Sequence, residues 1–525
     1  MKAALLALLS SGLLILSFPA FDYGFLAWVA LIPLFLALDG KRPKTAFLLS
    51  FFSGIGFLMG VFYWINHIKG VSPVDFLLLG IYLGSYYGFF GLLLSITARK
   101  PGLLRLLTAP AIWVSMEYLR SHAGFLALPW ALVGHTQYRY LPVIQVASLT
   151  GVYGVSYLLV MTNMFLADVI LMVTPREASP GLPLRSKLVK TCIIPVALVS
   201  LTMAYGVWIR QQTLSADKVS VTVVQGNIPQ GIKWNPAFLK SNIEKHVKLT
   251  EDASNQRKAQ LIVWPESTFP VFLRHDYFFS RTIHRLSVGI RSHLLVGSSQ
   301  RPKMGAKTLE DKDKNWSNSV YLFSPDGRVV DRYDKIRLLP FGEYLPEKDL
   351  IPWPPRFASG GANYIPGNRH TVFPLGNSRF GVLICWESLF PDLARKFVKE
   401  GAQFLVNMSN EAWFGETAAP YQFLSMNVFR AIENRVCLIR SVNTGISCFI
   451  DPSGEIIGTV LKGGKRIFVE GYLTKEISLS RGKTFYTIYG DLFAYANIIL
   501  AICLFLNVLW GKIVIFCFSM FRRSG

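Results

Sequence analysis

Charged residues are scarce in this chain of 525 residues. They make up 16% of it, against roughly 25% in ordinary soluble domains, whereas hydrophobic residues make up 51%. This composition excludes an intrinsically disordered protein and a wholly soluble enzyme. The mean hydropathy of +0.37 predicts that much of the chain lies in a lipid bilayer.

Cysteine is scarce as well. Six cysteines are too few for a fold built on disulfide bonds. Three of them lie in apolar stretches (Cys192, Cys503 and Cys517), which leaves Cys385, Cys437 and Cys448 elsewhere. Because three is an odd number, at least one of these thiols is expected to be free.

Acidic residues are the rarer charge, with 32 Asp and Glu against 54 Lys and Arg, and the formal net charge is +22. Such an excess suits a nucleic-acid partner, anionic lipid or the basic loops of a membrane protein. The polar region 210–484 has no periodic basic stripe or aromatic stacking platform, so we expect no nucleic-acid partner. For its positive charge, proximity to anionic lipid and an ordinary solvated surface both stay open.

Long apolar runs predict eight membrane spans, seven before residue 210 and one after residue 484. They cover 3–18, 24–38, 46–66, 76–97, 103–119, 152–173, 190–209 and 492–510. The first run has the alternative of a cleaved signal peptide, although no clean cleavage site of small residues follows Phe18.

Basic residues at the ends of these runs predict the orientation, because Lys and Arg are retained in the cytoplasm. With the N-terminus inside, the outside loops hold only Lys69, Arg120 and Arg139. This bias favours a multi-pass membrane protein with cytoplasmic N- and C-termini, which in a bacterium would lie in the inner membrane with the region between spans seven and eight in the periplasm. The expected division is a transmembrane domain (1–209), a periplasmic domain (210–484), and a final span with a short tail (485–525).

The region 210–484 predicts an α/β domain with packed sheets. Its expected strands are 219–225, 260–264, 293–297, 319–323, 329–333, 380–384, 403–407, 437–441 and 446–450, and its expected helices are 237–253, 389–400 and 420–434. Turn sequences at 325–327 (PDG) and 452–454 (PSG) predict two hairpins.

Three reactive side chains follow expected strands: Glu266, Lys335 and Cys385. A thiol has an ordinary pKa of about 8.5, so a neighbouring carboxylate is needed to take its proton at neutral pH. An ammonium could then hold the thiolate and later an oxyanion. Taken singly, each has a plainer explanation as a buried hydrophobic residue, a cap or a salt-bridge partner, and spacing alone does not bring them together.

The surrounding motifs resemble the nitrilase superfamily. They are residues 264–266 (WPE), Lys335 followed by 339–344 (LPFGEY), and 381–387 (GVLICWE). With seven spans before and one after, the whole chain resembles the bacterial apolipoprotein N-acyltransferase family. Residues 224–230 (VQGNIPQ), 129–130 (PW), 409–410 (SN) and 412–414 (AWF) fit it too. The resemblance implies a nitrilase-like αββα sandwich inserted between spans seven and eight.

The resemblance also implies roles for individual residues. Glu266 would be the general base, Lys335 the oxyanion stabiliser and Cys385 the nucleophile, supported by Glu343 and Glu387. There are two departures from the family pattern. Trp386 stands where Tyr is common, which leaves any role of a phenolic hydroxyl in doubt, and Glu411 stands where Asp is frequent.

The aromatic residues near these motifs are expected to handle substrate. The resemblance implies this role for Trp234, and we extend it to mobile aromatic arms and to a lateral portal lined by the apolar loop 123–146. The arms contain Phe341, Tyr344, Trp413 and Phe414. Their alternative is an ordinary belt of interfacial aromatic residues.

The reaction implied by the resemblance is a ping-pong acyl transfer. Cys385 would take an acyl chain from a phospholipid such as phosphatidylethanolamine and pass it, through a thioester, to the α-amine of a diacylglyceryl-cysteine on an apolipoprotein. No metal or organic cofactor is expected, since the sequence has no zinc signature or phosphate-binding glycine loop. Two alternatives are a membrane-tethered nitrilase-like amidase or lipid hydrolase, and a lipid-binding scaffold without chemistry.

Overall fold

The computed structural model describes residues 1–97, 102–174, 184–212, 217–269, 277–300, 316–354, 364–480 and 482–521. The chain divides into two compact units. The helical unit contains Met1–Asn66, Val71–Gln211 and Asp491–Gly525, and the α/β unit contains His67–Gly70 and Gln212–Gly490.

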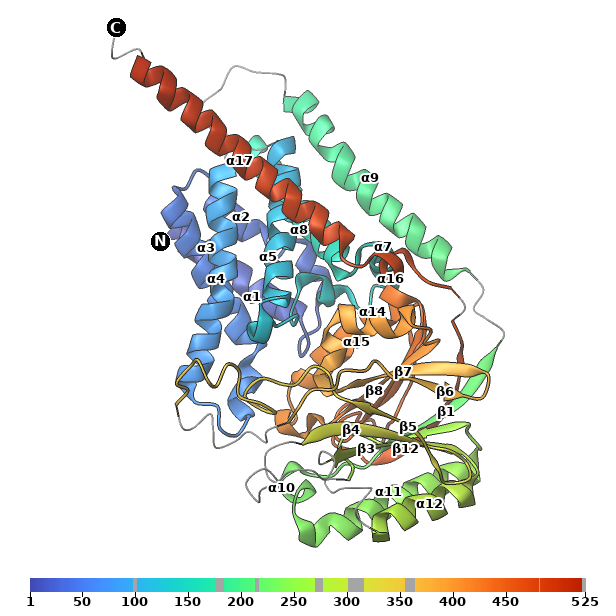
Figure 1. Ribbon diagram of the computed structural model, residues 1–525. Helices are drawn as coiled ribbons and strands as arrows, with labels where there is room; N and C mark the ends of the chain where they lie inside the picture. The colour runs from blue at the N-terminus through green and yellow to red at the C-terminus, as the bar shows by residue number, and fades with distance from the viewer. Residues whose placement is uncertain are drawn as a thin grey trace. The chain divides into compact units, whose positions relative to one another are not determined.

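The helical unit is built from apolar helices (Figure 1). Its longer helices are α1 (Lys2–Ser17), α3 (Pro43–Val61), α4 (Pro73–Thr97), α5 (Leu103–Ser121), α8 (Val152–Val173), α9 (Leu184–Arg210) and α17 (Leu492–Phe521). The shorter ones are α2 (Ile32–Leu38), α6 (Leu141–Ile144) and α7 (Ala147–Thr150). Each of the eight predicted spans thus contains a helix in the structure.

Five helical segments among the described residues are long and apolar enough to cross a membrane: Pro43–Val61, Pro73–Thr97, Val152–Val173, Cys192–Arg210 and Leu492–Trp510. The other three predicted spans fall on α1, which has 16 residues, on the segment Gly24–Leu38, and on α5, which contains Arg105, Glu117 and Arg120. The structure therefore agrees with a membrane domain, and the number of eight spans stays a prediction.

Small residues let α3 and α4 pack closely. A Cβ atom at Gly84 would lie 3.1 Å from the Phe51 carbonyl oxygen, and one at Gly91 would lie 2.6 Å from the Ala46 carbonyl oxygen. Such approaches are typical of helix pairs in membranes, where dispersion contacts replace the hydrophobic effect between helices.

The predicted portal loop 123–146 is held by hydrogen bonds within the helical unit. The Val133 amide and the Trp113 indole both donate to Glu117 Oε1, at 2.8 Å and 3.0 Å. Gln137 Nε2 donates to the Gly24 carbonyl at 2.7 Å. These bonds fix the middle of the loop, so its buried part is a structured connection.

The α/β unit contains two six-stranded sheets, in the orders β12-β1-β2-β3-β4-β5 and β11-β10-β9-β8-β7-β6. The first sheet comprises β1 (Lys218–Gln225), β2 (Leu261–Val263), β3 (His293–Gln300), β4 (Ser317–Phe323), β5 (Val329–Asp334) and β12 (Gly471–Ser478). The second comprises β6 (Val372–Leu375), β7 (Ser378–Ile384), β8 (Phe404–Ser409), β9 (Cys437–Val442), β10 (Cys448–Ile450) and β11 (Ile456–Thr459). In each sheet the central strands are parallel (β1-β2-β3 and β7-β8-β9).

Helices cover the outer faces of these sheets (Figure 1). On the first sheet, α11 (Pro236–Gln256) and α12 (Tyr277–Ile290) bury Ile243 and Ile283 in one cluster with Ile262 of β2. On the second, α14 (Pro391–Lys399) and α15 (Ala419–Asn434) pack against β7 and β9. Between the sheets, Ser441 Oγ of β9 donates to the Val263 carbonyl at 3.0 Å. This is the predicted αββα sandwich.

All nine predicted strands occur in the structure, with shifted ends, and so do the three predicted helices. The turns at 325–327 and 452–454 connect β4 to β5 and β10 to β11, as predicted. The sequence did not predict β6, β11, β12 or α12. The edge strands β11 and β12 are only half-buried, so they lack the apolar run that marked the central strands.

Candidate active site

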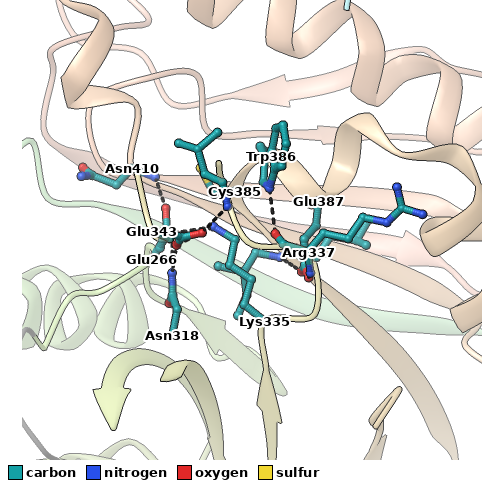
Figure 2. Close-up of polar contacts among 12 residues, drawn as sticks. Glu266, Asn318, Lys335, Arg337, Glu343, Cys385, Trp386, Glu387 and Asn410 are labelled. Atoms are coloured by element: carbon teal, nitrogen blue, oxygen red, sulfur yellow. Dashed lines mark hydrogen bonds and ion pairs between the residues drawn. The ribbon is translucent and has the colours of Figure 1, made fainter. Parts of the chain in front are cut away.

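The three predicted reactive residues lie together in the α/β unit (Figure 2). Glu266 follows β2, Lys335 follows β5 and Cys385 follows β7. Lys335 Nζ lies 3.7 Å from Glu266 Oε1 and 2.8 Å from Glu343 Oε1. Cys385 interacts electrostatically with Glu266 and Lys335. The two sheets therefore bring together side chains that are far apart in the sequence.

Cys385 stands on a sharp turn between β7 and the short helix η6 (Cys385–Leu389). Its φ of +54° is unusual for a residue other than glycine, and such backbone strain needs support from its surroundings. Asn407 on the neighbouring strand β8 supplies it, because its Nδ2 donates to the Cys385 carbonyl at 3.0 Å and to the Leu383 carbonyl at 3.1 Å. Arg440 Nε in turn donates to Asn407 Oδ1 at 3.2 Å.

The two carboxylates share one amide donor. Asn318 Nδ2 donates to Glu266 Oε1 at 2.8 Å and to Glu343 Oε1 at 3.1 Å. The other oxygens accept from backbone amides, Glu266 Oε2 from Asn410 at 2.9 Å and Glu343 Oε2 from Leu339 at 2.7 Å. Each carboxylate is thus fixed at both oxygens, which orients it toward Lys335.

Burial and charge set the proton affinities of the site. Burial opposes the charge on Lys335, but Glu343 and Glu266 outweigh burial and raise the pKa of this lysine above its ordinary value. Burial raises the pKa of the Cys385 thiol to about 12; Glu266 adds to the rise and Lys335 opposes it. The free site therefore holds an ammonium and a protonated thiol.

Glu387 ties the segment after Lys335 to the end of β7. Its Oε1 accepts from the Ile336 and Arg337 amides at 2.7 Å and 3.0 Å, and its Oε2 accepts from the Ile384 amide at 2.8 Å. The Tyr333 hydroxyl also donates to this carboxylate, at 2.9 Å. Burial raises the pKa of Glu387 to about 7, although these backbone bonds oppose the rise. All these partners are structural groups, so Glu387 positions the lysine and thiol segments.

Trp386 anchors the same segment from the other side. Its Nε1 donates to the Arg337 carbonyl at 2.7 Å, and its ring packs edge-on against Phe390, with the ring centroids 4.9 Å apart. The indole therefore acts through a hydrogen bond and packing at the position where the family commonly has Tyr.

The aromatic residues predicted to handle substrate lie on segments next to the site. Trp234 and Trp413 expose 42% and 46% of their surfaces, as a surface role requires. Phe341 packs edge-on against Trp353, and both Tyr344 and Phe414 are half-buried. Their part in substrate handling stays a prediction.

Sequence reasoning missed Asn318, Asn407 and Lys233. Lys233 Nζ donates to the Glu266 backbone carbonyl at 2.9 Å, and the side chain is buried. A polar residue after an apolar run inside a strand was an available signal for Asn407, whereas Asn318 lies between two serines at the start of β4 and gave no such signal. Lys233 gave no such signal, because a lysine in a short polar segment is typical of a solvated surface.

Within the described part of the chain, no group of three or more His, Cys, Asp or Glu side chains is placed to hold a metal ion. The expectation that no cofactor is needed stays a prediction.

Two family models match separate parts of this chain. The family model of the apolipoprotein N-acyltransferase N-terminal domain matches residues 10–165, and the carbon-nitrogen hydrolase model matches residues 220–484. An amidase structure from Nesterenkonia sp. is 17% identical, with a TM-score of 0.38, over 54% of this chain and 94% of its own.

Two curated relatives match nearly the whole chain. The apolipoprotein N-acyltransferase of Geobacter metallireducens is 38% identical, covering 94% of this chain and 92% of its own. That of Haemophilus influenzae is 30% identical over the same shares, 94% and 92%. The predicted resemblance is confirmed: this chain belongs to the apolipoprotein N-acyltransferase family, within the nitrilase superfamily.

Proposed function

We propose that this protein N-acylates lipoproteins, with a phospholipid as acyl donor and a Cys385 thioester as intermediate. The observation that carries the proposal is the buried cluster in which Lys335 lies between two fixed carboxylates beside Cys385. The printed names of the relatives support the acyl transfer to lipoproteins. The donor, the thioester and the residue roles are inferred from the chemistry of the cluster.

In the first half-reaction, Cys385 Sγ attacks an ester carbonyl of the phospholipid and its proton passes to Glu266. The carbonyl oxygen becomes an oxyanion, which the Lys335 ammonium stabilises. When the intermediate collapses, the carbon–oxygen ester bond breaks and Glu266 returns the proton to the leaving alkoxide. The products are a lysophospholipid and an acyl thioester on Cys385.

In the second half-reaction, the α-amine of a diacylglyceryl-cysteine attacks the thioester. Glu266 takes one proton from the amine, the carbon–sulfur bond breaks, and the same proton returns to the Cys385 thiolate. The products are an amide on the lipoprotein and the resting enzyme. Protons and bonds balance without a further reactant, so the mechanism requires no cofactor.

Glu343 and Asn318 position the charged groups in this scheme. Glu343 bonds Lys335 directly, and Asn318 bridges both carboxylates. Glu387 and Trp386 hold the Arg337 backbone, two residues after Lys335. Because oxyanion stabilisation depends on a donor already aimed at the developing charge, we assign these four residues to positioning.

The lipid substrates explain why the catalytic unit is joined to apolar helices. Withdrawing an acyl chain from the bilayer costs about 0.8 kcal/mol per CH₂, so the chemistry has to take place at the membrane. We assign Trp234, Phe341, Tyr344, Trp413 and Phe414 to contacts with the acyl chains.

We also propose an inner-membrane location, with residues 210–484 in the periplasm and both termini in the cytoplasm. A reporter fused after residue 210 that proved cytoplasmic would overturn this orientation.

Intact-protein mass spectrometry tests the proposed intermediate. The purified protein is incubated with phosphatidylethanolamine and without lipoprotein, and wild type is compared with Cys385→Ala. We expect a mass gain of one acyl chain that hydroxylamine removes and that the variant lacks. Fatty acid released without an adduct would favour a lipid hydrolase, and an intact phospholipid would exclude this donor.

A further inference from the structure

Lys233 is a buried lysine that the proposed reaction does not use. It ends the short helix α10 (Gln230–Lys233), and 4% of its surface is exposed. Its Nζ donates to the Glu266 backbone carbonyl at 2.9 Å. An ammonium loses its hydration on burial, so it needs compensating charge or hydrogen bonds nearby. For Lys233, this compensation comes from the segment that carries Glu266, whose backbone carbonyl accepts the hydrogen bond.

The charge balance of the site indicates a role for this lysine. Glu266 and Glu343 both face Lys335, so these three groups carry one more negative than positive charge. Lys233 adds a second positive charge, and its electrostatic interactions with Glu266 and Cys385 favour its charged form. With both lysines charged, the two carboxylates are balanced.

The segment that carries Lys233 is fixed to the same groups as Glu266. Asn410 Nδ2 donates to Gln230 Oε1 at 2.9 Å, and the Asn410 amide donates to Glu266 Oε2 at 2.9 Å. Asn443 connects the two parts, since its Nδ2 donates to Asn410 Oδ1 at 2.8 Å and its Oδ1 accepts from the Ile228 amide at 2.8 Å. The motif 224–230 therefore places Lys233 and Glu266 together.

We propose that Lys233 is a positioning residue whose positive charge, held beside Glu266 and Cys385, favours loss of the Cys385 thiol proton. A positive charge near the sulfur stabilises the thiolate relative to the thiol, so removing it should lower the thiolate fraction. The inference rests on the proposed function, in which Glu266 takes the Cys385 proton.

The other ionisable groups near Lys233 define the pH range of the effect. Glu266, Cys385 and, on α11, His246 interact electrostatically with Lys233, and Lys335 interacts in turn with Glu266, Glu343 and Cys385. Burial lowers the pKa of His246 to about 4, so this side chain is neutral above pH 6. Burial also lowers the pKa of Lys233 to about 8, opposed by Glu266 and Cys385. The compensating charge is therefore present at pH 7 and is lost above pH 9.

Alkylation of Cys385 by iodoacetamide tests the proposal without any lipid. The carbon–sulfur bond forms, iodide leaves, and the thiol proton passes to Glu266 or to solvent. The rate is measured from pH 6 to pH 10 on the full-length protein, with the Cys385 peptide quantified by mass spectrometry. The variants are Lys233→Met, Lys233→Gln, which keeps a donor without charge, and Lys233→Arg, which keeps both. The exposed Lys240→Met is the matched control.

At pH 7 we expect alkylation about tenfold slower in the Met and Gln variants, the effect of one pKa unit, and within about threefold of wild type in the Arg variant. The ratio of wild type to Lys233→Gln should fall toward one above pH 9, while Lys240→Met stays at wild-type rate throughout. A Gln variant that matches wild type at pH 7 would show that the hydrogen bond suffices and would overturn the role of charge. An equal slowing at every pH would show a purely structural role.

Thermal unfolding shows whether each variant is folded. If Lys233→Met does not fold, comparing the alkylation rates of Lys233→Gln and Lys233→Arg tests the role of charge in the same way. If neither folds, the wild-type profile decides: the rise in rate should lessen near pH 8 as the ammonium loses its proton, and an unbroken rise would overturn the proposal. The alkylation experiment uses no phospholipid. If alkylation gives the expected result but phosphatidylethanolamine gives no acyl adduct, only the proposed acyl donor is rejected.

Discussion

The two sheets of the α/β unit contribute to the site in different ways. The first sheet supplies charge: Glu266 follows β2, Lys335 follows β5, and Asn318 on β4 bridges the carboxylates. The second supplies the thiol and holds its backbone, through Asn407 on β8. Charge can be tuned by neighbouring groups, whereas the position of a nucleophile depends on a rigid backbone. Substitutions on the two sheets should therefore impair acylation in different ways.

The largest effect is expected on the charged side, from Lys335→Met. The change removes the proposed oxyanion donor, worth about 10²–10³-fold in rate, and leaves two buried carboxylates facing each other. We expect acyl-enzyme formation to slow by about 10³-fold and thermal stability to fall, because unpaired buried charges are costly. Single-turnover mass spectrometry measures the rate, with the exposed Lys348→Met as control. Full acylation in Lys335→Met would end the role assigned to this lysine.

The next effect is expected on the side that holds the backbone, from Glu387→Gln. The Gln side chain has one acceptor oxygen, so it cannot serve the amides of Ile336, Arg337 and Ile384 as the carboxylate does. A displacement of about 1 Å in these segments corresponds to roughly 100-fold in rate. The acylation rate and the melting temperature should both fall. An unchanged rate would show that the Lys335 segment is held by other contacts.

Asn318→Ala and Asn407→Ala form a matched pair that sharpens the comparison. Each removes an amide nitrogen that donates two hydrogen bonds, and we expect about tenfold slower acylation from each, as a loss of about 1.4 kcal/mol gives. Asn318→Ala should also change the pH dependence, because it frees two carboxylate oxygens, whereas Asn407→Ala should lower the rate equally at every pH. Identical profiles would contradict the division between the sheets.

The raised pKa of the Cys385 thiol predicts how the rate of its alkylation depends on pH. A pKa raised to about 12 means that the thiolate fraction is small at neutral pH and grows as the pH rises. Beyond the lesser slope expected near pH 8, where Lys233 loses its charge, alkylation of Cys385 in wild type should therefore still be increasing at pH 10, by up to about tenfold per pH unit, whereas a free cysteine levels off above its pKa of about 8.5. A plateau below pH 9 would show that the site holds a preformed thiolate.

The smallest effect is expected from Trp386→Phe. The variant keeps the packing against Phe390 and loses the hydrogen bond to the Arg337 carbonyl, which is worth about 0.5–1.5 kcal/mol. We expect acylation to slow by about two- to tenfold, measured as for Lys335→Met. A loss of more than 100-fold would indicate that the indole N–H takes part in more than backbone positioning.

The sequence predicted the strands that carry the reactive residues, because central strands are continuous apolar runs and Glu266, Lys335 and Cys385 stand directly after them. It did not predict the residues that orient them. Asn318 and Asn407 act through the pairing of β4 with β5 and of β7 with β8, and Lys233 acts through a contact with a segment that follows a different strand. Such contacts depend on register and on the packing of distant segments, which local spacing does not encode.

The last strand of the α/β unit pairs along its whole length with the first. β12 runs antiparallel to β1, from Lys218 opposite Ser478 to Gln225 opposite Gly471. During synthesis, β1 emerges early and its outer edge has to wait about 250 residues for its partner, which makes this closure a late, long-range step. An unpaired strand edge is prone to wrong pairing, so a chain that stops before residue 471 should aggregate even though every reactive residue of the site has been made.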